Sequence, residues 1–219
     1  MNNSDLYLYA VLAGNQGEGT NLHRERLSIV QFLSRGNLCA AFCFVPGPTA
    51  APNRRLYSRV MRRLLRHPAV LPAPRRTILP SQEALLELLA CQQTRMVEQL
   101  RRFAGLIEIR LRVVRKGGAA GRIVHAGLAD GEAALLAEER GYLHARFCSA
   151  LRSGWFTAKP LPLRHAHELL RLGCLLPQSS LPLFTLTCEA LKSRLGPEDD
   201  LIVSRPLAPV DFVDGRLFH

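Results

Sequence analysis

The sequence predicts an α+β protein built from two small α+β domains, the second of them a modified ferredoxin-like fold. Strand-like and helix-like segments alternate along the 219 residues, and 47% of the residues are hydrophobic, enough for a core. We place an N-terminal α+β domain that ends in a long helix at residues 1–104, and a C-terminal ferredoxin-like domain at residues 105–219.

The first domain is expected to open with strands. Residues 6–12 form an aromatic and apolar run that Gly14 ends, which is typical of a buried strand. Residues 27–32 and 38–45 flank Arg35-Gly36-Asn37, and this spacing predicts a hairpin with a Gly-Asn turn.

Two helices follow in the first domain. Apolar side chains recur every three or four residues between 53 and 66, which predicts an amphipathic helix. After a proline-rich turn and the short apolar strand Ile78-Leu79, Ser81 is placed to cap a single helix of about six turns. Gly105 is expected to end that helix.

The second domain reads as strand, helix, variable segment, strand, helix, strand. Its first strand, 107–113, alternates apolar with charged residues, so we expect one charged face. The remaining expected elements are a long helix at 130–151, a short helix at 166–172, a strand at 181–186, a helix at 189–194 and a strand at 201–203. The apolar face of the long helix is expected to comprise Leu135, Leu136, Tyr142, Leu143, Phe147 and Leu151.

Positive charge is concentrated in the first half. The net charge is +11, and residues 1–116 hold all of the excess, with 18 Lys and Arg against 7 Asp and Glu. The stretch 53–76 has eight arginines and no acid: Arg54, Arg55, Arg59, Arg62, Arg63, Arg66, Arg75 and Arg76. Such a patch attracts nucleic acid, an anionic membrane or an acidic protein face. The alternative is a solvated face whose arginine stems cover apolar surface.

Residue patterns that would support catalysis or cofactor binding are absent. His165 and His167 could be joined with Cys174 as metal ligands, but positions two apart on a helix face apart and the spacing matches no closed zinc pattern. The six scattered cysteines are interpreted as buried, reduced thiols of a cytosolic protein. We therefore predict no enzyme, metal or cofactor and no small-molecule substrate, with a Cys-His enzyme kept as a third possibility. That enzyme would need a deep pocket with a perturbed titratable group.

Nucleic-acid binding is the main alternative to a protein partner. The arginines could neutralise phosphates, yet only Tyr57 interleaves with them, and no RNP-like aromatic pair or zinc-finger spacing exists. Nucleic acid is possible but disfavoured. No run of about 18 apolar residues predicts a transmembrane segment, and the first residues do not resemble a secretory signal.

Four stretches carry a resemblance to a known family. The chain resembles the GvpF/GvpL family of gas vesicle proteins in four features. The first is the opening strand, and the second is a motif of the form Val-Leu-Pro-x-Arg-Phe-Gly-Thr-x-x-x-Ser-x-Glu-x-Leu. The third is a glycine followed by an alternating strand, and the fourth is a proline-rich closing segment. These stretches are Leu6–Ala10, Val70–Leu85, Gly105–Val113 and Pro206–Val213. Arg75-Arg76, or Arg76 alone, stands where the motif has Phe-Gly, and the closing Trp and Tyr are missing.

The resemblance implies a two-domain α+β accessory protein that is non-enzymatic and either cytoplasmic or associated with gas vesicles. Family members are thought to contact the small hydrophobic shell protein and other accessory proteins during gas vesicle formation. The expected function is therefore assembly through protein–protein interaction, and the eight arginines are the expected partner-binding residues.

Overall fold

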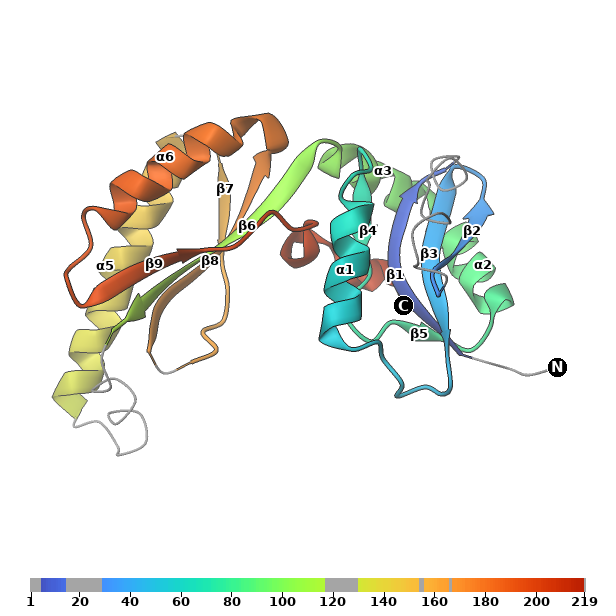
Figure 1. Ribbon diagram of the computed structural model, residues 1–219, viewed down its shortest axis with the longest axis horizontal. Helices are drawn as coiled ribbons and strands as arrows, with labels where there is room; N and C mark the ends of the chain where they lie inside the picture. The colour runs from blue at the N-terminus through green and yellow to red at the C-terminus, as the bar shows by residue number, and fades with distance from the viewer. Residues whose placement is uncertain (1–4, 15–28, 117–129, 154–155, 166, 219) are drawn as a thin grey trace. The chain divides into compact units, whose positions relative to one another are not determined.

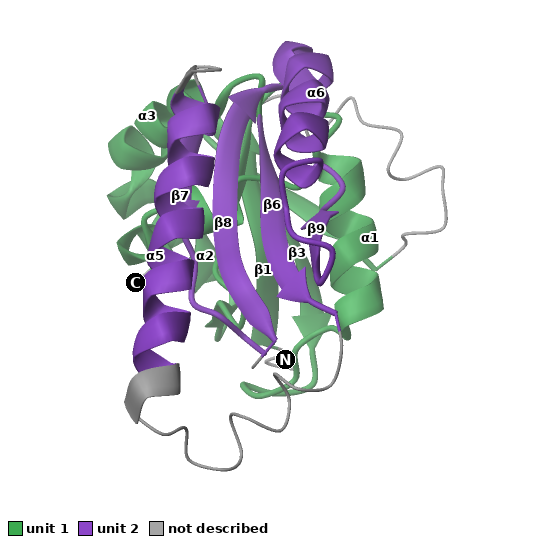
Figure 2. Ribbon diagram, turned by 90° about the vertical axis from the view of Figure 1, so that its left-hand side faces the viewer, with its two compact units in different colours: residues 1–106, 207–219 green, residues 107–206 purple. Residues whose placement is uncertain are grey.

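The computed structural model describes residues 5–14, 29–116, 130–153, 156–165 and 167–218. Contacts between Cα atoms divide the chain into two compact units, residues 1–106 with 207–219 and residues 107–206 (Figures 1 and 2). The closing segment thus belongs to the first unit by its contacts, whereas the sequence analysis assigned it to the second domain. Ala208, for example, is buried in the core of the first unit.

The first unit contains an antiparallel sheet in the order β2-β3-β1-β4, with β5 also pairing with β1. Its strands are β1 (Asp5–Ala13), β2 (Gln31–Arg35), β3 (Leu38–Val45), β4 (Val70–Pro72) and β5 (Ile78–Leu79). The predicted opening strand and hairpin are confirmed: Arg35 pairs with Leu38, and Gly36 in the two-residue turn has a φ of +55°. A type II′ hairpin turn takes a glycine with such a positive φ at its first central position.

Helices lie on both faces of this sheet. The helix α1 (Arg54–Leu64) packs on one face, and α2 (Gln82–Cys91) and α3 (Gln93–Phe103) cover the other (Figure 2). Strand β1 is consequently buried along nearly its whole length, which explains why residues 6–12 are all apolar or aromatic.

The prediction of a single long helix after Ser81 is wrong. The cap is present, since the Ser81 Oγ accepts from the Ala84 N–H at 3.2 Å, but the helix breaks at Gln92. The first part packs on β2 and β5 and the second on β1, β3 and β4, so the two helices follow different strands of the sheet.

The second unit has the ferredoxin-like arrangement that the sequence predicted. The order along the chain is β6 (Leu106–Arg115), α5 (Asp130–Ser153), β7 (Thr157–Pro160), β8 (Glu168–Pro177), α6 (Leu181–Lys192) and β9 (Asp199–Val203). The sheet order is β7-β8-β6-β9, and α5 and α6 cover one of its faces (Figure 1).

Two elements of this unit were assigned the wrong type. A short helix was expected at 166–172, but residues 168–172 form instead the start of the central strand β8, which is buried on both faces. An apolar run buried on both faces lacks alternation, so periodicity does not separate strand from helix. The strand expected at 181–186 belongs to α6, where Pro182 occupies the first turn and the buried Phe184, Cys188 and Leu191 recur at helical spacing.

The charged face of β6 and the apolar face of α5 also differ from expectation. Glu108 is fully buried and pairs with Arg110 at 2.7 Å, so that face of β6 is not simply solvated. On α5, Leu143, Phe147 and Leu151 enter the core as predicted, but Leu135 and Tyr142 are 68% and 64% exposed.

Candidate interaction surface

The arginine patch comprises the eight predicted residues, Arg54, Arg55, Arg59, Arg62, Arg63, Arg66, Arg75 and Arg76. The helix α1 carries five of them, because its apolar side chains Tyr57, Val60, Met61 and Leu64 face the sheet and leave the other positions to arginine. Asn53 caps the helix, its Oδ1 accepting from the Leu56 N–H at 2.9 Å. Seven of the eight side chains are exposed, and Arg63 is half-buried.

The seven exposed arginines of the patch form no ion pair with a carboxylate among the described residues. The first turn of α1 contains no acid. Arg54 and Arg55 stand in that first turn, where the helix dipole disfavours cations by about 0.3–1 kcal/mol each at low ionic strength. The patch therefore has an electrostatic cost that an anionic partner would relieve.

A tight turn places Arg75 beside α1. The Thr77 N–H and Oγ both donate to the Pro74 carbonyl, at 3.2 and 2.8 Å, which closes a four-residue turn. The Arg75 guanidinium lies 5.4 Å from the centre of the Tyr57 ring on α1. This cation–π contact ties the turn to the helix.

Arg76 has an unfavourable backbone conformation. Its φ is +71°, and among the described residues it is the one non-glycine with positive φ. It occupies the third position of the turn, where a type II turn takes glycine because of the positive φ. The chain therefore has an arginine where the backbone favours glycine.

An aromatic cluster supports the surface from below. The rings of Tyr7, Tyr9 and Tyr57 lie 5.0–6.5 Å apart, and the Cys43 thiol donates to the Tyr9 hydroxyl at 3.5 Å. Burial raises the pKa of the Tyr7 and Tyr9 phenols and of the Cys43 thiol. These groups stay neutral, so the positive charge above them is not offset from within.

The possible metal ligands do not come together. His165 and His167 are exposed and stack with ring centres 5.4 Å apart, whereas Cys174 is fully buried in the core of the second unit. No group of three or more His, Cys, Asp or Glu suited to a metal occurs among the described residues. Nor is any described helix long and apolar enough to cross a membrane.

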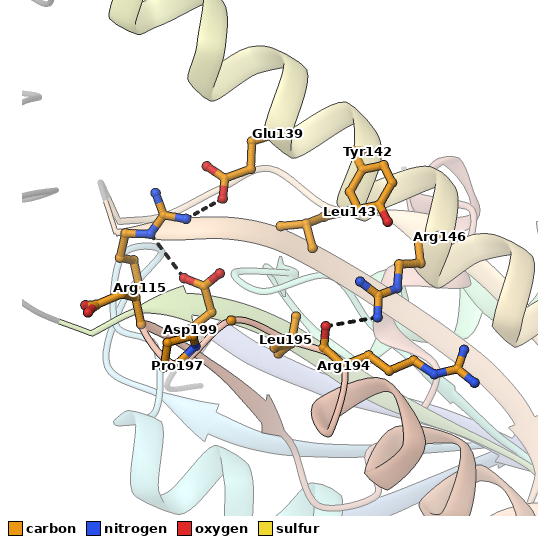
Figure 3. A pocket seen from close by; sticks show the side chains of 11 residues that line it. Arg115, Glu139, Tyr142, Leu143, Arg146, Arg194, Leu195, Pro197 and Asp199 are labelled. Carbon is orange, nitrogen blue, oxygen red and sulfur yellow. Dashed lines mark hydrogen bonds and ion pairs between the residues drawn. The ribbon is translucent and has the colours of Figure 1, made fainter.

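A groove in the second unit was missed by the sequence analysis. It has a volume of about 480 Å³ and lies between α5 and the α6–β9 connection (Figure 3). Its lining residues are Arg115, Glu139, Tyr142, Leu143, Arg146 and residues 194–199. The available signal was the surplus of large apolar residues on α5, which exceeds what one core-facing stripe needs.

Comparisons with known proteins agree with this fold. The family model described as gas vesicle synthesis protein GvpL/GvpF matches residues 5–126, which is more than half of the chain. The chain belongs to the GvpL/GvpF family. The matched region contains the whole arginine patch, whereas the closing stretch Pro206–Val213 lies outside it.

Two crystal structures of the same family share the fold over nearly the whole chain. The gas vesicle protein GvpF from Anabaena sp. PCC7120 superposes with a TM-score of 0.74 at 15% identity, covering 96% of this chain and 98% of that one. GvpF from Microcystis aeruginosa gives 0.73 at 14% identity, covering 95% and 98%. No curated protein matches the chain. At this identity the structures support the fold, not the conservation of individual surface residues.

Proposed function

We propose that this protein is a non-catalytic accessory factor of gas vesicle assembly, cytoplasmic or vesicle-associated, which binds the shell protein or other accessory proteins through the arginine patch. One observation carries the proposal: seven exposed arginines in a 23-residue stretch have no carboxylate partner among the described residues. Clustered like charges repel one another, and an acidic protein face would remove that repulsion.

Periodicity along α1 indicates how such a partner would meet the patch. Arg55, Arg59, Arg62 and Arg66 are spaced by four, three and four residues, so they form one stripe that extends just past the end of the helix. Adjacent members rise by about 4.5–6 Å along the axis. An acidic stripe with helical spacing on the partner would match this pattern.

The first experiment is capture of gas vesicle proteins on the immobilised protein. The triple charge reversal of Arg59, Arg62 and Arg66 to Glu uses exposed positions only, and it should abolish capture of the shell or accessory protein. The matched control reverses Arg95, Arg101 and Arg102, which are exposed on α3 of the same unit and give the same change in charge. Equal capture by both variants and the parent would reject the patch as the binding surface.

The second experiment tests the assembly role itself. Deletion of the gene from a gas-vesicle-forming cell should reduce the number of vesicles or change their shape. Vesicles normal in number and shape, in a cell without a second member of the family, would refute the role.

Nucleic acid remains the second candidate, favoured by the same row of cations. Seven phosphate contacts would give a log–log salt slope of about −6. However, Tyr57, the aromatic residue among these arginines, is buried beneath Arg75 and not available for stacking on bases. Failure of DNA and RNA to bind at low salt would remove this candidate.

A further inference from the structure

The groove of the second unit is lined in part by side chains that do not belong to the core of that unit. Its α5 wall is formed by Glu139, Tyr142, Leu143 and Arg146. Glu139, Tyr142 and Arg146 follow Leu135 at helical spacing on a stripe separate from the one that enters the core. Tyr142 is 64% exposed and Leu135 is 68% exposed. Two large apolar side chains on one exposed stripe are available to a ligand rather than to the core.

One end of the groove is closed by ion pairs. The Arg115 guanidinium pairs with Glu139 of α5 and, at 3.1 Å, with Asp199 of β9 (Figure 3). Two carboxylates therefore meet one guanidinium there, and Glu198 also lines the groove. This end has surplus negative charge and would attract a cation.

The other end is positive. Arg146 donates to the Arg194 carbonyl at 3.0 Å, an interaction that fixes its guanidinium at the C-terminal end of α6 (Figure 3). Within the described ranges, neither Arg146 nor Arg194 pairs with a carboxylate. The Arg194 carbonyl therefore holds the Arg146 guanidinium in position, while the charge of this guanidinium remains available to an anion.

Apolar surface connects the two ends. Tyr142, Leu143, Leu195 and Pro197 lie between them, and the Arg146 guanidinium sits 6.0 Å from the centre of the Tyr142 ring. Glu139 and Arg146 are seven residues apart on the helix, a rise of about 10 Å. An extended peptide covers this distance in about three residues.

We infer that the groove binds an extended segment of a partner protein with a glutamate or aspartate beside an apolar residue and a lysine or arginine three residues before the acid. The carboxylate meets Arg146 and Arg194, the apolar side chain lies against Tyr142 and Leu195, and the cation meets Glu139 and Glu198. This site is in a different unit from the arginine patch and does not depend on the proposed function.

The test is a nuclear magnetic resonance titration of the full-length ¹⁵N-labelled protein at low salt with acetyl-Lys-Ala-Leu-Glu-amide. Amide shifts should map to residues 139–146 and 194–199, with saturation at millimolar peptide. Replacing the peptide's glutamate by glutamine should weaken binding about tenfold, the effect of losing one charge-assisted hydrogen bond. Replacing its lysine by glutamine should weaken binding several-fold.

Protein variants locate the site. Arg194→Gln should weaken binding of the glutamate peptide about tenfold and reduce its preference over the glutamine peptide, because Arg146 alone then meets the carboxylate. Arg152→Gln, an exposed arginine of the same helix outside the groove, should leave both unchanged. Shifts that map to α1 instead, equal affinity for the two peptides, or equal effects of the two protein variants would each overturn the inference.

Discussion

Replacing Arg76 by glycine should stabilise the protein and weaken its partner binding at the same time. The backbone at Arg76 is left-handed, with φ at +71°, and a non-glycine residue there costs about 1–2 kcal/mol. Glycine removes this cost but adds back about 0.4–1 kcal/mol of unfolded-state entropy. From the middle of each range, the expected net gain in the free energy of unfolding is about 0.8 kcal/mol.

Urea unfolding followed by circular dichroism measures this gain. With a slope of about 2 kcal/mol per molar urea, the midpoint should rise by about 0.4 M while the slope stays unchanged. Arg75→Gly is the matched control, because it removes the same charge from the neighbouring position but loses the contact over Tyr57. That variant should be less stable than the parent.

Two results would refute the reasoning. An Arg76→Gly variant that is less stable than the parent would mean that the arginine side chain contributes more than the strained backbone costs. A variant that is more stable but captures gas vesicle partners as well as the parent would mean that the arginine is not kept for binding.

Three further predictions use the described packing. Replacing Arg54 by Glu should stabilise α1 by about 0.3–1 kcal/mol, measured by thermal unfolding, because it puts an acid at the positive end of the dipole; an unchanged midpoint would contradict the electrostatic cost of the first turn. A thiol reagent should label Cys91 quickly and the other five cysteines only on unfolding. Cys91 is exposed, whereas burial raises the pKa of thiols such as Cys188, in that case to about 12. Fast labelling that persists in the Cys91→Ser variant would contradict this prediction. Burial raises the pKa of Glu168, but the Arg164 N–H and Arg112 lower this pKa by a larger amount, so the net shift is downward. The stabilisation that the Glu168 carboxylate contributes is therefore complete above the unfolded pKa of about 4.3, and it is lost as the pH falls below that value. Urea unfolding at pH 7 and pH 3.5 should therefore show a larger loss for the parent than for Glu168→Gln, and equal losses would show that this carboxylate does not contribute.

The elements that the sequence predicted well are those with one buried face. The helix α1 was found from its spacing, and the arginine stripe on it follows from the same periodicity, since the side chains that do not face the sheet must face solvent. The hairpin was equally clear because its turn residues have a specific backbone role. In both cases a local pattern determines the local structure.

The errors occur where tertiary packing decides. Strand β8 is buried on both faces between its neighbours, so its run of leucines contains no alternation to read. The break at Gln92 depends on which strands α2 and α3 cover, and nothing in the local sequence indicates this change. The groove beside Tyr142 likewise needs the α6–β9 connection, 50 residues later in the chain, to form its second wall.

Arginines elsewhere in the same chain show that the patch is not a general property of its composition. The three arginines of β6 all pair with carboxylates. Arg110 pairs with the buried Glu108, Arg112 with the buried Glu168, and Arg115 with both Glu139 and Asp199. In the patch, by contrast, arginines stand at the unfavourable end of a helix dipole and at a left-handed backbone position, and its seven exposed arginines form no ion pair with a described carboxylate. Sequences usually agree with their own fold at every level, and departures gather where function requires them. Both departures lie within residues 54–76 of the first unit, so an anionic partner that binds these arginines would offset their cost.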